Sequence, residues 1–207
     1  MEVDSSVSCK HQLRRAVRAA MHAAGPHVSR VGLLLAAGAS RRFGEADKLL
    51  APLGGRPLLA HAAAAMLAAP LDLRIAVISN PALVPHLEGF RVVTIPPGWQ
   101  ADSLRAGLAA AGTPERLLVA LGDMPDVTAA HLARVLKAAT DDGAAASHDG
   151  AAALPPACFP RCLLPALRAL SGDRGAGSLL RGLPPERLIP APGLLRDVDR
   201  PDDLAPR

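Results

Sequence analysis

The chain has 207 residues, of which half are hydrophobic but only 2% are aromatic. This length favours one domain with an aliphatic core, and the scarcity of aromatic rings argues against stacking recognition of single-stranded nucleic acid. The formal net charge is +4 and much of the excess lies in the first thirty residues, so we expect a small anionic ligand rather than nucleic acid.

The cysteine content and the hydropathy pattern indicate a cytoplasmic protein. Cys9, Cys158 and Cys162 are an odd number without the paired spacing of a zinc site, as is typical of a reduced compartment. No apolar stretch approaches the length of a membrane span, and the N-terminus has no apolar core of a signal peptide. We therefore expect no membrane contact.

Residues 1–30 differ from the rest, and we divide the chain into a basic N-terminal extension, 1–30, and a domain, 31–207. Leu13, Val17 and Met21 recur at helical spacing within the extension. The segment is either a helix that targets the protein or binds a partner, or an extension that frays in solution, because short isolated helices are marginally stable.

From residue 31 onward, apolar runs alternate with helical patterns. The pattern predicts strands at 31–35, 73–79, 91–95, 116–121, 187–189 and 194–197, and a hairpin within 144–154 that turns at Asp149–Gly150. It predicts helices at 56–69, 82–87, 101–112, 128–140, 162–170 and 175–183. Near-continuous aliphatic strands between helices indicate an α/β fold, a Rossmann-like three-layer sandwich whose mostly parallel sheet has helices on both faces.

In such a fold ligands bind beyond the carboxyl ends of the strands, which draws attention to the loop that starts at Ala36. Small residues there let backbone N–H groups approach a ligand, and Arg41, Arg42 and Lys48 supply cations for phosphate oxygens. A solvated, charged loop without a ligand is the alternative.

The spacing excludes two common phosphate loops. Gly38 and Gly44 are six positions apart and Glu45 follows, which does not fit a Walker loop. Ser40 stands where the dinucleotide fingerprint requires its second glycine.

The loop matches a different signature. "LAAGASRRFG" with Lys48 after it resembles the L-A-A-G-x-S-x-R-x-G…K motif of the nucleotidyltransferases of molybdenum cofactor biosynthesis. Further motifs follow in the family's order, over most of residues 31–204: "SLRAGL", "LGDMP", "CFPR", "LSGDRGAGSLL" and "DVDRPDDL". The resemblance implies a single α/β domain that binds a nucleoside triphosphate.

The resemblance also implies roles for individual residues. The backbone of Leu35, Ala36, Ala37 and Gly38 would border the base and phosphates, with Arg42 and Lys48 on the phosphates and Ser103 beside the nucleotide. Arg42, Lys48 and Asp123 would be the catalytic residues.

Carboxylates at predicted strand ends suggest a metal site. Asp123 ends an apolar strand, either as a turn or N-cap residue or as a ligand of Mg²⁺, which prefers oxygen donors. Asp197 or Asp199 could approach the same ion, although "DRPDD" also suits a helix start. The resemblance favours Asp123 and Asp197 as the Mg²⁺ pair.

The implied reaction is attack by a phosphate of molybdopterin on the α-phosphorus of the nucleotide, with release of pyrophosphate. Ala-Ala-Gly and Gly-Asp-Met-Pro resemble the molybdopterin cytidylyltransferase branch, which uses CTP, and the guanylyltransferase branch, with GTP, is the alternative. A molybdoenzyme, or a chaperone that matures one, is the implied protein partner.

The match departs from the family pattern in two places. Residues 99–102 carry Trp99 and Asp102 where the family tends toward glycine and serine, and Leu154 and Pro155 replace a usual glycine and its neighbour. Asp102 could cap a helix, or could place negative charge beside a triphosphate. These departures sustain another hypothesis, a degenerate nucleotide-binding regulatory homologue without transferase activity.

Overall fold

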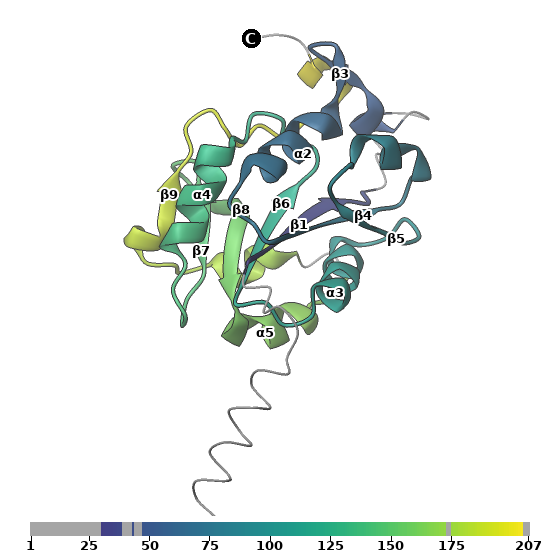
Figure 1. The fold of residues 1–207 in the computed structure, drawn as a ribbon. Coiled ribbons are helices and arrows are strands. Elements are labelled where there is room, and N and C mark those ends of the chain that lie inside the picture. The colour runs from purple at the N-terminus through teal and green to yellow at the C-terminus, as the bar shows by residue number, and fades with distance from the viewer. Residues whose placement is uncertain (1–29, 39–42, 44–46, 173–174, 205–207) are drawn as a thin grey trace, which may run out of the picture.

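The computed structural model describes residues 30–38, 43, 47–172 and 175–204 (Figure 1). Nearly all of the predicted extension, with its helix, lies outside these residues. Arg41 and Arg42 of the phosphate-binding prediction lie outside them as well.

A seven-stranded sheet forms the centre, in the order β5-β4-β1-β6-β8-β7-β9. Its strands are β1 (Arg30–Ala36), β4 (Leu73–Ile78), β5 (Arg91–Thr94), β6 (Arg116–Leu121), β7 (Ala145–His148), β8 (Ala153–Pro160) and β9 (Leu188–Pro190). The strands from β5 to β6 are mutually parallel, β8 is antiparallel to its neighbours β6 and β7, and β9 is parallel to β7. A separate two-stranded hairpin consists of β2 (Pro52–Leu53) and β3 (Arg56–Pro57).

Helices cover both faces of the sheet (Figure 1). The α-helices are α2 (Leu58–Ala68), α3 (Gln100–Ala111), α4 (Ala129–Ala138) and α5 (Leu164–Arg168). The 3-10 helices are η1 (Lys48–Leu50), η2 (Pro81–His86), η3 (Arg161–Leu163), η4 (Ala176–Leu180), η5 (Pro185–Arg187) and η6 (Pro201–Leu204). The predicted α/β three-layer fold is confirmed.

Alternate residues of β1 show how the strands divide the core. Leu34 and Ala36 pack with α2 and α4 in one cluster, whereas Leu33 and Leu35 pack with α3 and α5 in the other. Strand side chains point alternately to opposite faces, so a strand covered on both sides must be apolar throughout.

Local chemistry explains where two of the helices lie. Thr128 caps α4 by accepting a hydrogen bond from the His131 backbone N–H at 3.2 Å. Helix α3 packs closely on β1 because Gly107 has no side chain: a Cβ there would lie 2.3 Å from Leu33 Cδ1. A larger residue at this position would force Leu33 or the helix to shift.

The predicted strand at 194–197 is wrong. The chain turns after β9, where Leu194 N–H donates to the Ala191 carbonyl at 3.1 Å and Gly193 has a φ of +72°. The segment then runs past the carboxyl end of β6, so Asp197 does not end a strand.

Three predicted helices are shorter or tighter than expected. The 82–87 helix is the 3-10 helix η2, and the 162–170 helix divides into η3 and α5. The 175–183 helix shrinks to η4 because Gly177 disfavours helix and Gly182, at φ +76°, reverses the chain. None of the described helices has the length and apolar composition needed to cross a bilayer.

Candidate active site

The site lies where β1 and β6 end side by side. The two strands are parallel neighbours, with Leu35 opposite Leu121, so their carboxyl ends share one edge of the sheet. The chain leaves β1 toward β4 on one side, and β6 lies on the other, which makes this edge a topological switch point where ligands of open α/β sheets bind.

A tight contact fixes Asp123 at this edge. Gly122 N–H donates to the Leu35 carbonyl at 2.9 Å, and a Cβ at Gly122 would lie only 3.2 Å from the Ala36 Cβ. The "GDMP" motif therefore needs glycine for close approach, and this approach holds Asp123 beside the loop that follows β1.

A cavity of about 140 Å³ opens between these elements. It is lined by Leu35, Ala37, Gly38, Gly98, Gln100, Ser103, Leu121 and Asp123. Four of the predicted nucleotide-binding residues are therefore brought together, whereas Ala36 packs into the opposite core cluster. The prediction for Arg42 lies outside the described residues.

Lys48 is the positive centre of the site. Its Nζ lies 2.7 Å from Asp123 Oδ2, 3.1 Å from Asp199 Oδ1 and 3.9 Å from Asp197 Oδ1. It also donates to the Val198 carbonyl at 2.9 Å. The sequence placed Lys48 on phosphates, and the structure places it among the carboxylates predicted to hold the metal.

The charges shift two pKa values in this cluster. Burial alone would lower the pKa of the Lys48 amine, but the carboxylates of Asp123, Asp199 and Asp197 outweigh it and raise the pKa. Burial and the negative charge of Asp123 raise the pKa of Asp197 to about 7, against the opposing effect of Lys48. Three carboxylates surround one ammonium, so the cluster favours a further cation.

Backbone hydrogen bonds hold the C-terminal segment against Asp123. Val198 N–H donates to the Asp123 carbonyl at 3.1 Å. The Asp203 carboxylate accepts from the N–H groups of Asp199 at 2.9 Å and Arg200 at 2.8 Å. These hydrogen bonds hold Asp197 and Asp199 beside the carboxyl end of β6.

The donor set fits a hard divalent cation. Asp123 Oδ1 is buried and has no hydrogen-bond partner among the described residues, which is costly unless a cation or a bound ligand contacts it. No group of three or more Asp, Glu, His or Cys in the described part of the chain is arranged to hold a metal. A cation here would take two carboxylates and complete its shell with water or phosphate, as Mg²⁺ does.

The negative charge of Asp102 is balanced by neighbours at the start of α3. Its Oδ2 accepts a hydrogen bond from the Trp99 backbone N–H at 3.1 Å, so it fixes the start of α3. Its Oδ1 pairs with Arg105, one turn further along the helix. Asp102 is thus a capping residue whose charge is compensated locally.

Sequence reasoning missed two features of the site. Gln100 begins α3 and lines the cavity, but it lies one position before the predicted helix and belongs to none of the matched motifs. The bidentate pair of Arg196 with Asp126, with its shorter contact at 2.7 Å, joins segments seventy residues apart, for which the sequence has no local signal. The pair ties the segment before Asp197 to the loop after Asp123.

The sequence comparison assigns the domain. Residues 32–188 match the family described as "MobA-like NTP transferase domain". The chain belongs to this family. The MobA-like match spans both strand ends that form the site, and it places the domain in a nucleotidyltransferase family.

Individual MobA-like relatives support the assignment. The chain is 34% identical over 168 residues to "Nicotine blue oxidoreductase" of Paenarthrobacter nicotinovorans, covering 74% of this chain and 82% of the relative. The crystal structure of Rv0371c from Mycobacterium tuberculosis is 29% identical with a TM-score of 0.74, over 84% of this chain and 95% of that one. A complex of Rv0371c with manganese is 28% identical with a TM-score of 0.70, over 84% of this chain and 96% of that one.

Proposed function

We propose that the protein transfers CMP from CTP to the phosphate of molybdopterin and releases pyrophosphate, with Mg²⁺ as its cofactor. GTP in place of CTP is the alternative nucleotide. The observation that carries the proposal is the Asp123–Lys48 cluster beside the cavity at the ends of β1 and β6. The domain would span residues 31–207, with 1–30 as an extension.

Asp123 and Asp197 would hold the Mg²⁺, with Asp199 as a further candidate. The ion would supply charge neutralisation at the triphosphate. Asp123 Oδ1, which is buried without a described partner, is the oxygen best placed to contact it. The manganese complex of Rv0371c supports a divalent cation in this family.

The remaining residues position the nucleotide. Ala37 and Gly38 let the backbone approach it, and the buried Ser103 lies on the cavity wall at the start of α3. Lys48, and Arg42 from the same loop, would stabilise the leaving pyrophosphate. An acceptor phosphate oxygen attacks the α-phosphorus, and the bond to the β-phosphate oxygen breaks. The acceptor phosphate is largely ionised near pH 7, so no strong general base is required.

A pyrophosphate-release assay with Mg²⁺ and molybdopterin tests the proposal, with CTP, GTP and ATP compared. We expect release with CTP and a loss of roughly 100-fold or more in Asp123→Asn, since that variant removes a charged ligand but keeps the side-chain shape. Near wild-type turnover of Asp123→Asn would contradict the metal role. Nucleotide binding without turnover for all three triphosphates would instead support the regulatory hypothesis.

A redox reaction is the second candidate, and it rests on the relative named nicotine blue oxidoreductase. The same preparation, assayed for NADH or NADPH oxidation with a planar heterocyclic dye as acceptor, separates the two. Turnover in this assay without pyrophosphate release would favour the oxidoreductase.

A further inference from the structure

Two more cavities lie next to the cavity beside Asp123, which is called the nucleotide cavity after its proposed ligand. The next has a volume of about 360 Å³ and shares Leu35, Gln100 and Leu121 with the first. The last, of about 430 Å³, shares Gly177 and Arg181 with the second. The three cavities are therefore neighbours in a row, here called the trough, which runs from Asp123 at the acidic end to His148 at the far end.

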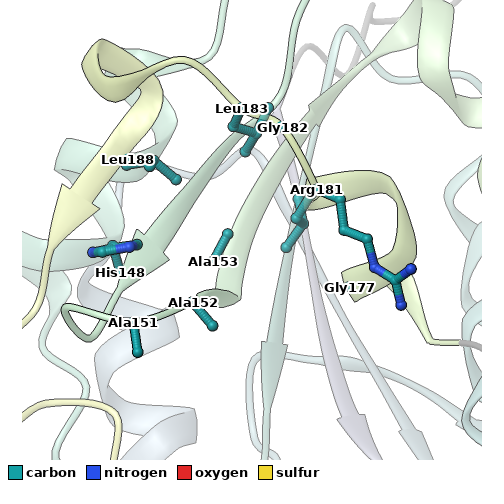
Figure 2. Close-up of a pocket in the computed structure, with 10 residues that line it drawn as sticks. His148, Ala151, Ala152, Ala153, Gly177, Arg181, Gly182, Leu183 and Leu188 are labelled. Carbon is teal, nitrogen blue, oxygen red and sulfur yellow. The ribbon is translucent and has the colours of Figure 1, made fainter.

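Arg181 lies at the junction of the two outer cavities and is exposed. It has no hydrogen-bond or ion-pair partner among the residues that the structure describes. Figure 2 shows the Arg181 guanidinium and the His148 ring on opposite sides of the outer cavity, with Ala152 and Ala153 between them. A guanidinium is well suited to recognise phosphate, because its N–H groups can bind two oxygens at once.

His148 supplies the polar group at the far end. Its Nδ1 accepts a hydrogen bond from the Gly150 backbone N–H at 3.1 Å. The neutral ring therefore carries its proton on Nε2, which leaves one N–H donor for a ligand. Apart from His148 and Arg181, the outer cavity is lined by alanine, glycine and leucine residues, which suit a flat apolar ring.

We propose that Arg181 recognises the anionic group of the acceptor and that the outer cavity holds the acceptor's planar heterocycle, with His148 donating to a ring oxygen or nitrogen. This assignment rests on the proposed transfer to a phosphorylated heterocycle. The order of the groups along the trough supports it, since the acceptor phosphate must lie between its ring and the nucleotide at Asp123. A volume of about 430 Å³ is ample for a small heterocycle.

Gly177 offers a steric test of the trough. It lines both outer cavities, and a Cβ built on it meets no atom within 4 Å. A larger residue therefore meets no clash at its Cβ, and Gly177→Leu should narrow the passage, whereas the cavity beside Asp123, which Gly177 does not line, should stay open.

Binding is measured on the full-length protein by calorimetry, with a pterin that carries a phosphomonoester on its side chain and with the same pterin lacking the phosphate. Wild type should bind the phosphorylated pterin roughly tenfold or more tightly than the other. Arg181→Gln should remove this preference and leave CTP affinity unchanged. His148→Phe should weaken both pterins, and Gly177→Leu should abolish binding of both. Arg91→Gln, on the far sheet edge, is the matched control.

The role of Arg181 would be overturned if wild type bound the two pterins equally tightly. It would also be overturned if Arg181→Gln bound the phosphorylated pterin as tightly as wild type does. An equal loss of CTP affinity in Arg181→Gln would assign the residue to the nucleotide instead. Unchanged binding in Gly177→Leu would exclude the passage. If binding follows the expectation while no triphosphate releases pyrophosphate, the transferase proposal fails and the anion site stands.

Discussion

Lys48 Nζ lies 2.7 Å from Asp123 Oδ2, with both side chains largely buried. This ammonium neutralises the carboxylate whose other oxygen, Oδ1, the proposed divalent cation would contact. Lys48 and the proposed metal would therefore compete for the negative charge of Asp123, and a lysine released by the metal would be free to contact phosphate oxygens.

We expect Lys48→Met to bind Mn²⁺ more tightly than wild type in the absence of nucleotide, because the variant lacks the competing ammonium. It should also lose about 2–3 kcal/mol of unfolding free energy without metal, since the largely buried Asp123 carboxylate loses its ammonium partner. Manganese titration and urea unfolding with and without Mn²⁺ measure both effects. Lys137→Met, at an exposed position of α4, is the control. Weaker Mn²⁺ binding by Lys48→Met would contradict the competition.

The raised pKa of Asp197 predicts how metal-free stability depends on pH. The folded pKa is about 7 against a usual 3.8, so the folded state holds a proton that the unfolded chain releases. The stabilisation is complete below pH 3.8 and is lost as the pH rises through 7. Thermal unfolding between pH 5 and pH 8 should show a larger fall in Tm for wild type than for Asp197→Asn. Parallel profiles for the two proteins would exclude this assignment.

Arg105→Gln tests the local compensation of Asp102. The variant leaves an unpaired carboxylate at the start of α3, beside Gln100 and Ser103 of the nucleotide cavity. Both partners are partly exposed, so we expect a modest rise of about two- to fivefold in the KM for the triphosphate. Asp102→Asn in the Arg105→Gln background should restore the KM. A KM that stays constant in both variants would show that Asp102 does not influence the nucleotide.

A buried polar chain near the outer cavity should matter for stability. His131 Nε2 lies 2.8 Å from Ser147 Oγ, which donates to the Pro156 carbonyl at 2.8 Å and so joins α4, β7 and β8. Burial, together with the charge of Arg134, lowers the pKa of His131, which favours the neutral ring. Ser147→Ala leaves His131 Nε2 and the Pro156 carbonyl without this hydrogen-bond partner. It should lower the free energy of unfolding in urea by about 1–3 kcal/mol. The exposed Ser178→Ala is the control, and an equal effect of both substitutions would refute this view.

The central strands and the loops after them could be predicted because their signals are local. The apolar runs of β1 and β6 mark their own positions, and the motifs that follow them place Gly38 and Asp123 at one edge by the rules of parallel sheets. The cavity confirms that these segments meet.

The features that the sequence did not predict depend on contacts between residues distant in sequence. Lys48 meets Asp199 across 151 positions, and no local pattern distinguishes an ammonium paired with carboxylates from one facing phosphate. The 194–197 segment begins with two leucines, as many strands do, but the chain turns at Gly193 and the Val198 N–H donates to the Asp123 carbonyl, so the segment crosses the end of β6. Arg181 stands outside the quoted motifs and becomes notable only where two cavities meet.

Trp99 is the only tryptophan of the chain, which has no tyrosine, and it is 58% exposed between two residues that line the nucleotide cavity, Gly98 and Gln100. Excitation near 295 nm therefore excites a single residue, Trp99. Because Trp99 is flanked by two residues that line the cavity, its fluorescence should report ligand binding in real time without an attached dye.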